Sequence, residues 1–515
     1  MAKVGAAAAL LAAAGMIGQV AALARELFVA SQVGASIGLD ALLVALVLPI
    51  LLSGIIAGSL RTAVVPAYLR LAESKGTDVA QQFLGVVLTW TMIGAVSAVL
   101  FLAVTPALGL AVAGPGLSDA GRVQAAAFLP LVLPILALSV LSHMLSAICQ
   151  IADRYRPIAV ALVVAPVVSL LVTLIAWESA GLTSVALGLT VGHAVSVVAL
   201  SAFAARAHLL PPITLWAGRS DLGEFARHAV PLTVGSAVLQ FNLVADRAIA
   251  TLMTVGSVSV LKFGQQLVTE PLGSLASAWT TAVYPALVRT GQGGGQRTLG
   301  SAATVALRYG LAIFVPVSVG VAALAPLIVG VVYERGAFDS AAALATSQVV
   351  VGFAPMLTLV MLQPIITGAH NTRRRGLLLG TTAVANAASN IALNLVLGRL
   401  LGVAGIALST SFTVAILLAF LCHRLAVSEP DFDLRSVGYT AGRALAASAV
   451  PGVAAATIAW TLGPDLAWPG NLFALVGTAA TGLVLYVLLA TIMRMEEPEV
   501  LMRWLAGARA RRVAP

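Results

Sequence analysis

Long stretches of apolar residues, each close to the length that crosses a bilayer, run through almost the whole chain. A transmembrane helix needs about 20 such residues, because backbone polar groups in the hydrocarbon must be satisfied within the helix. Mean hydropathy is +1.02 and only 10% of residues are charged, whereas a soluble domain carries about a quarter. The pattern predicts an all-α polytopic membrane protein of about 14 transmembrane helices. We expect the spans at residues 6–33, 38–66, 82–111, 124–150, 156–177, 183–206, 229–254, 257–286, 301–332, 342–368, 375–398, 402–425, 439–463 and 470–493.

The net charge of +9 is distributed in the way that orients a membrane protein. If both termini and every second loop are cytoplasmic, these segments hold 22 of the 29 Lys and Arg residues. The opposite loops hold only Arg122, Arg335 and Arg399. A miscounted helix would invert every later loop and erase this asymmetry. We therefore expect a membrane protein with both termini cytoplasmic, whose first apolar stretch is an uncleaved helix rather than a signal peptide.

Other classes of function are disfavoured by the sequence. The basic residues lie in short gaps between apolar runs, without base-reading or stacking residues, so we expect no nucleic-acid partner. Cys149 and Cys422 lie in apolar stretches without metal-ligand spacing. The sequence contains no recognisable nucleophile–base set, paired catalytic carboxylates or metal-spaced histidines. We expect a transporter that needs no cofactor, not an enzyme.

A short pattern occurs twice in the chain, six expected spans apart. Thr62-Ala-Val-Val-Pro66-Ala-Tyr-Leu-Arg70 closes the second span, and Thr281-Ala-Val-Tyr-Pro285-Ala-Leu-Val-Arg289 closes the eighth. Both copies lie on the same side of the membrane, so the repeat is parallel. Two six-helix lobes in parallel repeat, with the site between them, are typical of transporters. We expect an N-terminal lobe, a cytoplasmic linker, a C-terminal lobe, two extra C-terminal helices and a basic cytoplasmic tail at residues 1–208, 209–228, 229–425, 426–494 and 495–515.

Four basic residues inside the expected spans are counted with neither set of loops: Arg25, Arg61, Arg247 and Lys262. A charge at the bilayer centre costs about 2.5–3.5 kcal/mol and therefore faces a cavity or a partner. Arg25 precedes Glu26, and the two could form a self-compensating pair. Alternatively, Arg25 faces the cavity between the lobes and binds an anionic head group, because a guanidinium suits phosphate. Asp40 lies at the outer start of the second span. It is either a helix-start residue favoured by the helix dipole or a residue that takes part in the function of the protein.

Two polar stripes mark further candidate residues. Lys262, Gln266 and Glu270 follow one another at a spacing of four residues and share one helix face, which indicates the lining of a wet cavity. Glu270 precedes a proline and could instead lie at an interface. In the eleventh span, Asn386, Asn390 and Asn394 have the same spacing. Such asparagines either join helices or, opposite a buried carboxylate such as that of Asp246, supply oxygens to a monovalent cation, with a hydroxyl from Thr410.

Several segments, in order from the first span to about residue 425, together resemble the MurJ (MviN) family of lipid II flippases. This family lies within the superfamily that also contains MATE drug exporters and polysaccharide-precursor flippases. The most specific segment is Glu334-Arg-Gly-Ala-Phe338, between the ninth and tenth spans. The other segments that carry the resemblance are Ala24-Arg-Glu-Leu-Phe-Val-Ala30, Gly38-Leu-Asp-Ala41, Leu48-Pro49, Val65-Pro66, Asp246-Arg-Ala-Ile-Ala250, Gly256-Ser-Val-Ser-Val260, Gly368-Ala-His-Asn-Thr-Arg373, Asn390-Ile-Ala-Leu-Asn394 and Gly405-Ile-Ala-Leu-Ser-Thr410.

The resemblance implies export of lipid II, the undecaprenyl-pyrophosphate-linked peptidoglycan precursor, by alternating access. An ion gradient or the membrane potential would drive it. By position, Arg25 and Glu26 match the family's Arg-Asp pair, which lines the cavity. The sodium site of some members matches Asp246, Asn390, Asn394, Thr410 and the carbonyl of Ile406. The implied partners are a polyprenyl-pyrophosphate-linked glycan as substrate and membrane lipids. We expect a monomer. The cell-wall synthesis machinery is a further candidate partner.

The chain departs from the family pattern at two cavity positions. Ser53-Gly54 stands where the family has a basic pair, and Gln266 stands where it has an arginine. Lys262 lies one turn earlier, about 6 Å along the axis, and could restore that charge. Asn394 stands where an acid would strengthen a sodium site. We expect the substrate to contact the following residues: Arg25, Glu26, Asp40, Arg61, Lys262 and Gln266.

Three alternatives to a lipid II flippase stay open. The missing arginines suggest a flippase for another undecaprenyl-linked glycan, such as an exopolysaccharide or teichoic-type precursor. A MATE-like exporter of cationic drugs is disfavoured because a basic cavity would repel its substrates. A scaffold without transport activity is the third.

Overall fold

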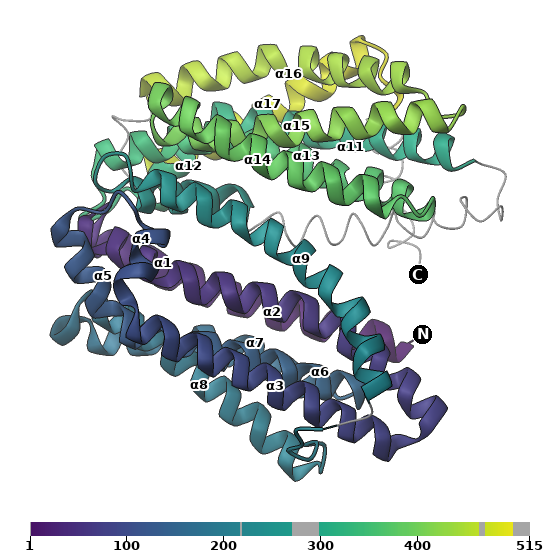
Figure 1. Ribbon diagram of the computed structural model, residues 1–515. Coiled ribbons are helices and arrows are strands. Elements are labelled where there is room, and N and C mark those ends of the chain that lie inside the picture. Colours follow the sequence, from purple (N-terminus) through teal and green to yellow (C-terminus); the bar gives the residue numbers. More distant parts are fainter. Residues whose placement is uncertain (1, 217–218, 270–297, 463–468, 498–515) are drawn as a thin grey trace, which may run out of the picture. The chain divides into compact units, whose positions relative to one another are not determined.

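The computed structural model describes residues 2–216, 219–269, 298–462 and 469–497, and within them the chain forms helices and no strands (Figure 1). This confirms the all-α prediction. Thirteen of the described helical segments are long and apolar enough to cross a membrane. A further helix runs over residues 257–269, and it is the start of the expected span 257–286. The rest of that span, with the second copy of the repeated pattern, lies outside the described residues. A count of about 14 spans agrees with these helices.

The chain divides into two compact units, Met1–Ser259 and Val260–Pro515. In the first unit, α2 packs against α5, α6 and α9, while α7 packs against α1 and α8 (Figure 1). Its helices are α1 (Ala2–Val33), α2 (Ile37–Lys75), α3 (Thr77–Val104), α4 (Pro106–Ala113), α5 (Asp119–Val132), α6 (Pro134–Ile151), α7 (Tyr155–Ala180), α8 (Leu182–Arg206) and α9 (Arg219–Ala250).

In the second unit, α11 and α15 pack against α13, α14 packs against α15, and α16 packs against α11 and α17 (Figure 1). Its helices after residues 257–269 are α11 (Leu299–Ala323), α12 (Ala325–Val332), α13 (Ser340–Thr372), α14 (Gly376–Leu401), α15 (Val403–Ser428), α16 (Leu434–Leu462) and α17 (Gly470–Ile492).

The compact units do not coincide with the lobes expected from the repeat. The expected scheme assigns residues 229–254 to the C-terminal lobe, whereas α9 packs against α2 within the first unit. Compactness and internal repetition are different properties of a chain. The lobes at 1–208 and 229–425 therefore stay a prediction.

Three of the expected spans are interrupted, because prolines break their helices. The expected span 82–111 is divided between α3 and α4, with Pro106 opening α4. The span 301–332 is divided in the same way between α11 and α12, with Pro326 in the first turn of α12. Pro134 opens α6 and separates it from α5 within the span 124–150. Proline has no backbone N–H and disfavours helix in the residue before it, so helices end there. The third and ninth spans, six apart, share this division.

Small residues let neighbouring helices approach closely where the candidate residues lie. A Cβ added at Gly188 of α8 would lie 2.7 Å from the carbonyl oxygen of Ser169 on α7. A Cβ at Gly405 of α15 would lie 2.0 Å from the carbonyl oxygen of Leu397 on α14. Only glycine allows these approaches, which are typical of packed transmembrane helices. The α7–α8 and α14–α15 pairs are thereby held at short distance.

Candidate functional site

Arg25 lies in α1, and its side chain is buried, since the residue is only 8% exposed. Its Nη2 lies 2.9 Å from Oε1 of Glu26, the next residue along the chain. Its Nη1 donates a hydrogen bond of 2.7 Å to Oγ of Ser169 on α7. The self-compensating pair is thus present, and α7 in addition fixes the direction of the guanidinium.

A second arginine of the first unit contributes to the charge around this pair. Arg247 of α9 interacts electrostatically with its neighbour Asp246 and with Glu26. Asp246 is 6% exposed. Two arginines and two carboxylates within the helices of this unit therefore balance one another, which lowers the cost of placing each charge in the membrane.

Asp40 lies in the first turn of α2 and is 5% exposed. Its Oδ2 accepts a hydrogen bond of 2.7 Å from the N–H of Gly256. Its Oδ1 accepts bonds of 2.8 Å from the N–H of Ser259 and 2.6 Å from the hydroxyl of Ser259. The first N–H groups of a helix have no partner within it, so Asp40 caps the helix that starts at residue 257.

The capping contact brings together two segments that are far apart in the sequence. Gly256 has a φ of +86°, which is unfavourable for residues with a side chain. A Cβ there would also lie 2.9 Å from the carbonyl oxygen of Ala35, before α2. The segments Gly38-Leu-Asp-Ala41 and Gly256-Ser-Val-Ser-Val260 are therefore two halves of one contact. The sequence contained both segments, but it gave no sign that they meet.

Lys262 and Gln266 lie on the helix at residues 257–269, one turn apart as expected. Gln266 is 7% exposed, and its Oε1 is buried without a hydrogen-bond partner among the described residues. Nζ of Lys262 lies 5.8 Å from the ring centre of Phe263. Glu270, the third residue of the predicted stripe, lies outside the described residues.

The segment Glu334-Arg-Gly-Ala-Phe338 supports this same helix. The rings of Tyr333 and Phe338 lie 4.9 and 5.5 Å from the ring of Phe263, and all three side chains are buried. Contacts of this kind contribute about 0.5–1.5 kcal/mol per pair beyond the apolar area that they bury. The most specific segment of the family resemblance thus supplies Phe338, one of the two aromatic rings that pack against the helix carrying Lys262.

The two positions that lack the family's basic pair are filled by other groups. The hydroxyl of Ser53 donates to the carbonyl of Ile50 at 3.0 Å. A Cβ added at Gly54 would lie 1.9 Å from Nε2 of Gln240 on α9, so an arginine there would first displace the glutamine side chain. The side chain of Arg61, one of the expected substrate contacts, lies outside the described part of the chain.

The candidate cation ligands of the second unit form a hydrogen-bonded network between α14 and α15. Asn394 donates to Oδ1 of Asn390 at 3.1 Å, and Asn390 donates to Thr410 at 3.1 Å. The hydroxyls of Ser409 and Thr410 donate to the carbonyl of Ile406 at 2.8 and 3.1 Å, and Ser409 also donates to Asn394. The sequence did not single out Ser409. The network joins two helices, whereas Asp246 belongs to the other unit.

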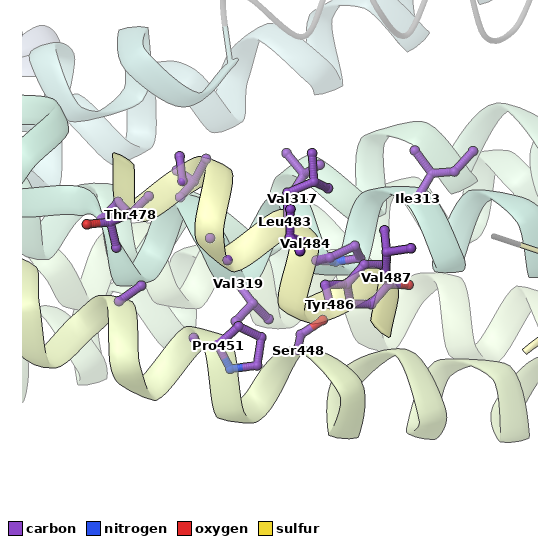
Figure 2. A pocket seen from close by; sticks show the side chains of 18 of the residues that line it. Ile313, Val317, Val319, Ser448, Pro451, Thr478, Leu483, Val484, Tyr486 and Val487 are labelled. Carbon is purple, nitrogen blue, oxygen red and sulfur yellow. The ribbon is translucent and has the colours of Figure 1, made fainter. Parts of the chain in front are cut away.

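An apolar groove lies between α11, α16 and α17 in the second unit, and we call it the α11–α16–α17 groove (Figure 2). Its volume is about 890 Å³, and its lining includes Val317 of α11, Pro451 of α16 and Leu483 of α17. The hydroxyl of Tyr486 donates to the carbonyl of Ala312 at 2.6 Å, and both residues line the groove. The sequence did not reveal this groove, because the pattern of one helix does not show which other helices pack beside it.

Comparison with known proteins gives consistent matches. The family model described as lipid II flippase MurJ matches residues 29–464. A probable lipid II flippase MurJ of Thermotoga maritima is 24% identical over 489 residues, covering 94% of this chain and 96% of the relative. One of Rickettsia prowazekii is 24% identical over 356 residues, covering 68% and 70%.

Solved structures share the fold. A lipid II flippase MurJ in an inward closed conformation superimposes with a TM-score of 0.77 at 20% identity, covering 94% of this chain and 98% of that one. An inward-facing MATE-family multidrug resistance transporter of the MOP superfamily gives a TM-score of 0.66 at 14% identity, covering 82% and 98%.

Proposed function

This chain belongs to the family of the lipid II flippase MurJ, and on that premise we propose that it moves lipid II from the inner to the outer leaflet of the cytoplasmic membrane by alternating access. It is an integral membrane transporter of the bacterial inner membrane, not an enzyme. The observation that carries the proposal is the match of the family model over residues 29–464, most of the chain.

Arg25 is the residue best suited to bind the diphosphate of such a cargo. A guanidinium has five N–H donors, and those used in the described contacts go to Ser169 and Glu26. The remaining donors can bind phosphate oxygens in the forked geometry that arginine prefers. We infer that Glu26 balances the charge of Arg25 while the cargo is absent, and that the diphosphate takes over this role when it binds.

Rescue of cells depleted of their own lipid II flippase tests the function. Expression of this chain should restore growth and the appearance of lipid II in the outer leaflet, measured by its accessibility to an externally added label. If the protein is present in the membrane at normal levels but growth is not restored, the lipid II cargo is wrong. Rescue of a strain that lacks another undecaprenyl-linked glycan flippase would then support the second candidate.

Replacing Lys262 with alanine should lower rescue about tenfold if this lysine takes the place of the family's arginine. One lost charge–phosphate contact corresponds to about 1.5–3 kcal/mol, or at least one order of magnitude. Adding Gln266→Arg to Lys262→Ala should restore activity, because the charge returns one turn further along the same helix face. Full activity of Lys262→Ala alone would rule out the relocated charge.

We propose that a monovalent cation is coupled to transport through the second unit. Amide, hydroxyl and carbonyl oxygens of Asn390, Asn394, Thr410 and Ile406 suit a hard cation, although they already bond one another. Asn390→Ala should remove any dependence of transport on sodium in vesicles with an imposed gradient, whereas Asn390→Asp should retain it. Unchanged transport and ion dependence in Asn390→Ala would exclude coupling through this network.

We also infer from the distribution of Lys and Arg that both termini are cytoplasmic. A monomer is sufficient for alternating access, since the repeat supplies two lobes from one chain. An undecaprenyl-linked cargo makes the cell-wall synthesis machinery a natural functional partner.

A further inference from the structure

Two histidines lie within the helices of the first unit, and the function proposed above uses neither of them. His143 lies on α6 and His193 on α8, and these helices pack against each other (Figure 1). His143 is exposed and His193 is half-buried. Histidine gains or loses a proton near neutral pH more readily than other side chains. Both residues are therefore candidates for binding a proton.

The hydrogen bonds of the two rings define where a proton can bind. Nδ1 of His143 lies 2.7 Å from the carbonyl oxygen of Ser139, and Nδ1 of His193 lies 2.8 Å from that of Leu189. A carbonyl oxygen only accepts, so Nδ1 of each ring carries a hydrogen and Nε2 has the lone pair. Within the described part of the chain, no hydrogen bond involves either Nε2. Each ring therefore offers one nitrogen to a proton from water.

His143 lies on a polar face of α6. The face is formed by further polar side chains that are three or four residues apart and so share one side of the helix: Ser139, Ser142, Ser146 and Gln150. Ionisable residues in transmembrane helices face the interior of the bundle or a water-filled cavity, not the lipid. The exposed surface at His143 therefore faces water.

His193 connects this polar face with Arg25. Its neighbour Gly192 lies against α7, since a Cβ added there would be 3.3 Å from the backbone nitrogen of Ser169. The hydroxyl of Ser169 accepts the hydrogen bond from Arg25. His193 interacts electrostatically with both His143 and Arg25. A guanidinium and two imidazoles from α1, α6 and α8 thus influence one another.

The other ionisable groups of the surrounding helices lie elsewhere. Glu26 pairs with Arg25. The electrostatic partners of His193 in the described part of the chain include no carboxylate. The side chain of Arg61 on α2 lies outside the described residues. The other ionisable residues of the helices that pack against α6 and α8, and of these two helices, lie near helix ends: Asp40, Tyr68, Arg70, Glu73, Lys75, Asp78, Asp119, Arg122, Cys149, Tyr155, Arg156, Glu178 and Arg206.

We propose that His143 and His193 form a proton-binding site of the first unit, which takes up one proton when the diphosphate of the cargo binds at Arg25. The identity of the cargo rests on the proposed function. Without cargo, the guanidinium repels an imidazolium beside it, so both rings stay neutral. The negative charge of the diphosphate reverses this balance, and Nε2 of one ring takes a proton from water. When the diphosphate leaves, the same N–H bond breaks and the proton returns to water.

The bound proton supplies a positive charge that this chain otherwise lacks. Ser53, Gly54 and Gln266 stand where the family has basic residues. An imidazolium is a charged hydrogen-bond donor to phosphate oxygens, as an arginine is, but only while it holds its proton. We therefore expect cargo binding to depend on pH, stronger at lower pH and weaker as pH rises.

Isothermal titration calorimetry of the purified full-length protein counts the proton. The ligand is farnesyl lipid II, in which a short prenyl chain replaces the undecaprenyl chain. Titrations in buffers of different ionisation enthalpy give the number of protons taken up, because the buffer supplies them. The wild-type protein should take up about one proton per ligand at about pH 7, and above that its affinity should fall by up to about tenfold per pH unit.

His143→Gln with His193→Gln replaces both rings with neutral polar side chains. This variant should take up no proton, and its affinity should not vary with pH. At about pH 7 it should bind farnesyl lipid II about tenfold more weakly than the wild type, the effect of one lost charged contact. His423→Gln is the matched control, because His423 is an exposed histidine of α15 in the second unit. It should keep the wild-type proton uptake and affinity.

NMR of the wild-type protein with isotope-labelled histidine rings provides a second measurement that does not depend on the folding of the double variant. Addition of farnesyl lipid II at constant pH should shift the ring nitrogens of His143 or His193 from the neutral to the protonated pattern. Those of His423 should not change.

Three outcomes would overturn the proposal. The first is binding of farnesyl lipid II, or of another polyprenyl-diphosphate-linked glycan, without proton uptake. The second is equal uptake in the double histidine variant and in His423→Gln. The third is that no such glycan binds at all. Failure of rescue, with proton uptake on binding another polyprenyl-diphosphate-linked glycan, would contradict only the lipid II cargo. Rescue without proton uptake would contradict only the proton site.

Discussion

Replacement of Arg25 with alanine should abolish rescue of flippase-depleted cells, with transport at least about 100-fold lower than in the wild type. The substitution removes the donors that we assign to the diphosphate. It also leaves the carboxylate of Glu26 without the partner that lies 2.9 Å away. Hydrogen bonds to charged groups contribute about 1.5–3 kcal/mol each, and each 1.4 kcal/mol is a factor of ten, so the loss of two such bonds to the diphosphate corresponds to a factor of at least about 100. Growth and outer-leaflet lipid II measure the effect, at matched amounts of protein in the membrane.

Further variants separate cargo binding from charge balance. Arg25→Ala with Glu26→Gln removes both charges, so recovery of rescue would mean that Arg25 only neutralises Glu26. Arg25→Lys keeps the charge but loses the planar guanidinium that can bind two phosphate oxygens at once. It should retain a small part of the activity. Ser169→Ala removes only the 2.7 Å hydrogen bond and should have a mild effect. Arg122→Ala, at an exposed arginine that bonds the carbonyl of Pro115, is the matched control and should rescue fully.

The sequence predicted the positions of the membrane spans well, because a run of about 20 apolar residues has few other stable solutions. It did not predict where helices break within a run. Pro106, Pro134 and Pro326 were visible, but prolines also lie inside helices, as Pro49 and Pro66 do in α2. Neighbouring helices decide whether a proline is accommodated within a helix or ends it, and the sequence of one helix does not describe its neighbours.

For the candidate site residues, too, the sequence predicted contacts within one helix but not contacts between helices. Helical spacing correctly put Asn390 and Asn394 in contact, because residues four apart share a face. Partners from other helices were not foreseen: Ser169 binds Arg25 and Ser259 binds Asp40 across separations of 144 and 219 residues. Periodicity identifies the buried face of a helix, but it does not identify the helix that packs against it. Gly188, beside Ser169, was a usable signal, since small residues mark close approaches.

Asp40→Asn should destabilise the protein by about 3 kcal/mol and strongly impair transport. The carboxylate accepts three hydrogen bonds, from the N–H of Gly256 and from the N–H and hydroxyl of Ser259. Asparagine offers one acceptor oxygen, and its NH2 group would face N–H donors, which leaves at least one buried donor unsatisfied. Bonds to a charged group contribute about 1.5–3 kcal/mol, and an unsatisfied buried donor costs about 1–3 kcal/mol. Thermal unfolding of the purified protein measures the loss.

Asp339→Asn is the matched control for the capping carboxylate. Asp339 caps α13 from an exposed position and accepts one hydrogen bond of 2.8 Å, from the N–H of Ala342, so its replacement should cost about 1 kcal/mol or less. If Asp40→Asn lowers the unfolding temperature no more than Asp339→Asn, the buried carboxylate is not a stabilising cap. A variant that is destabilised but transports normally would make Asp40 a static cap. A variant that keeps its stability but loses transport would instead mean that Asp40 acts in turnover. It would then either contact the cargo, as the sequence predicts, or form a capping contact that breaks when the transporter changes its side of access.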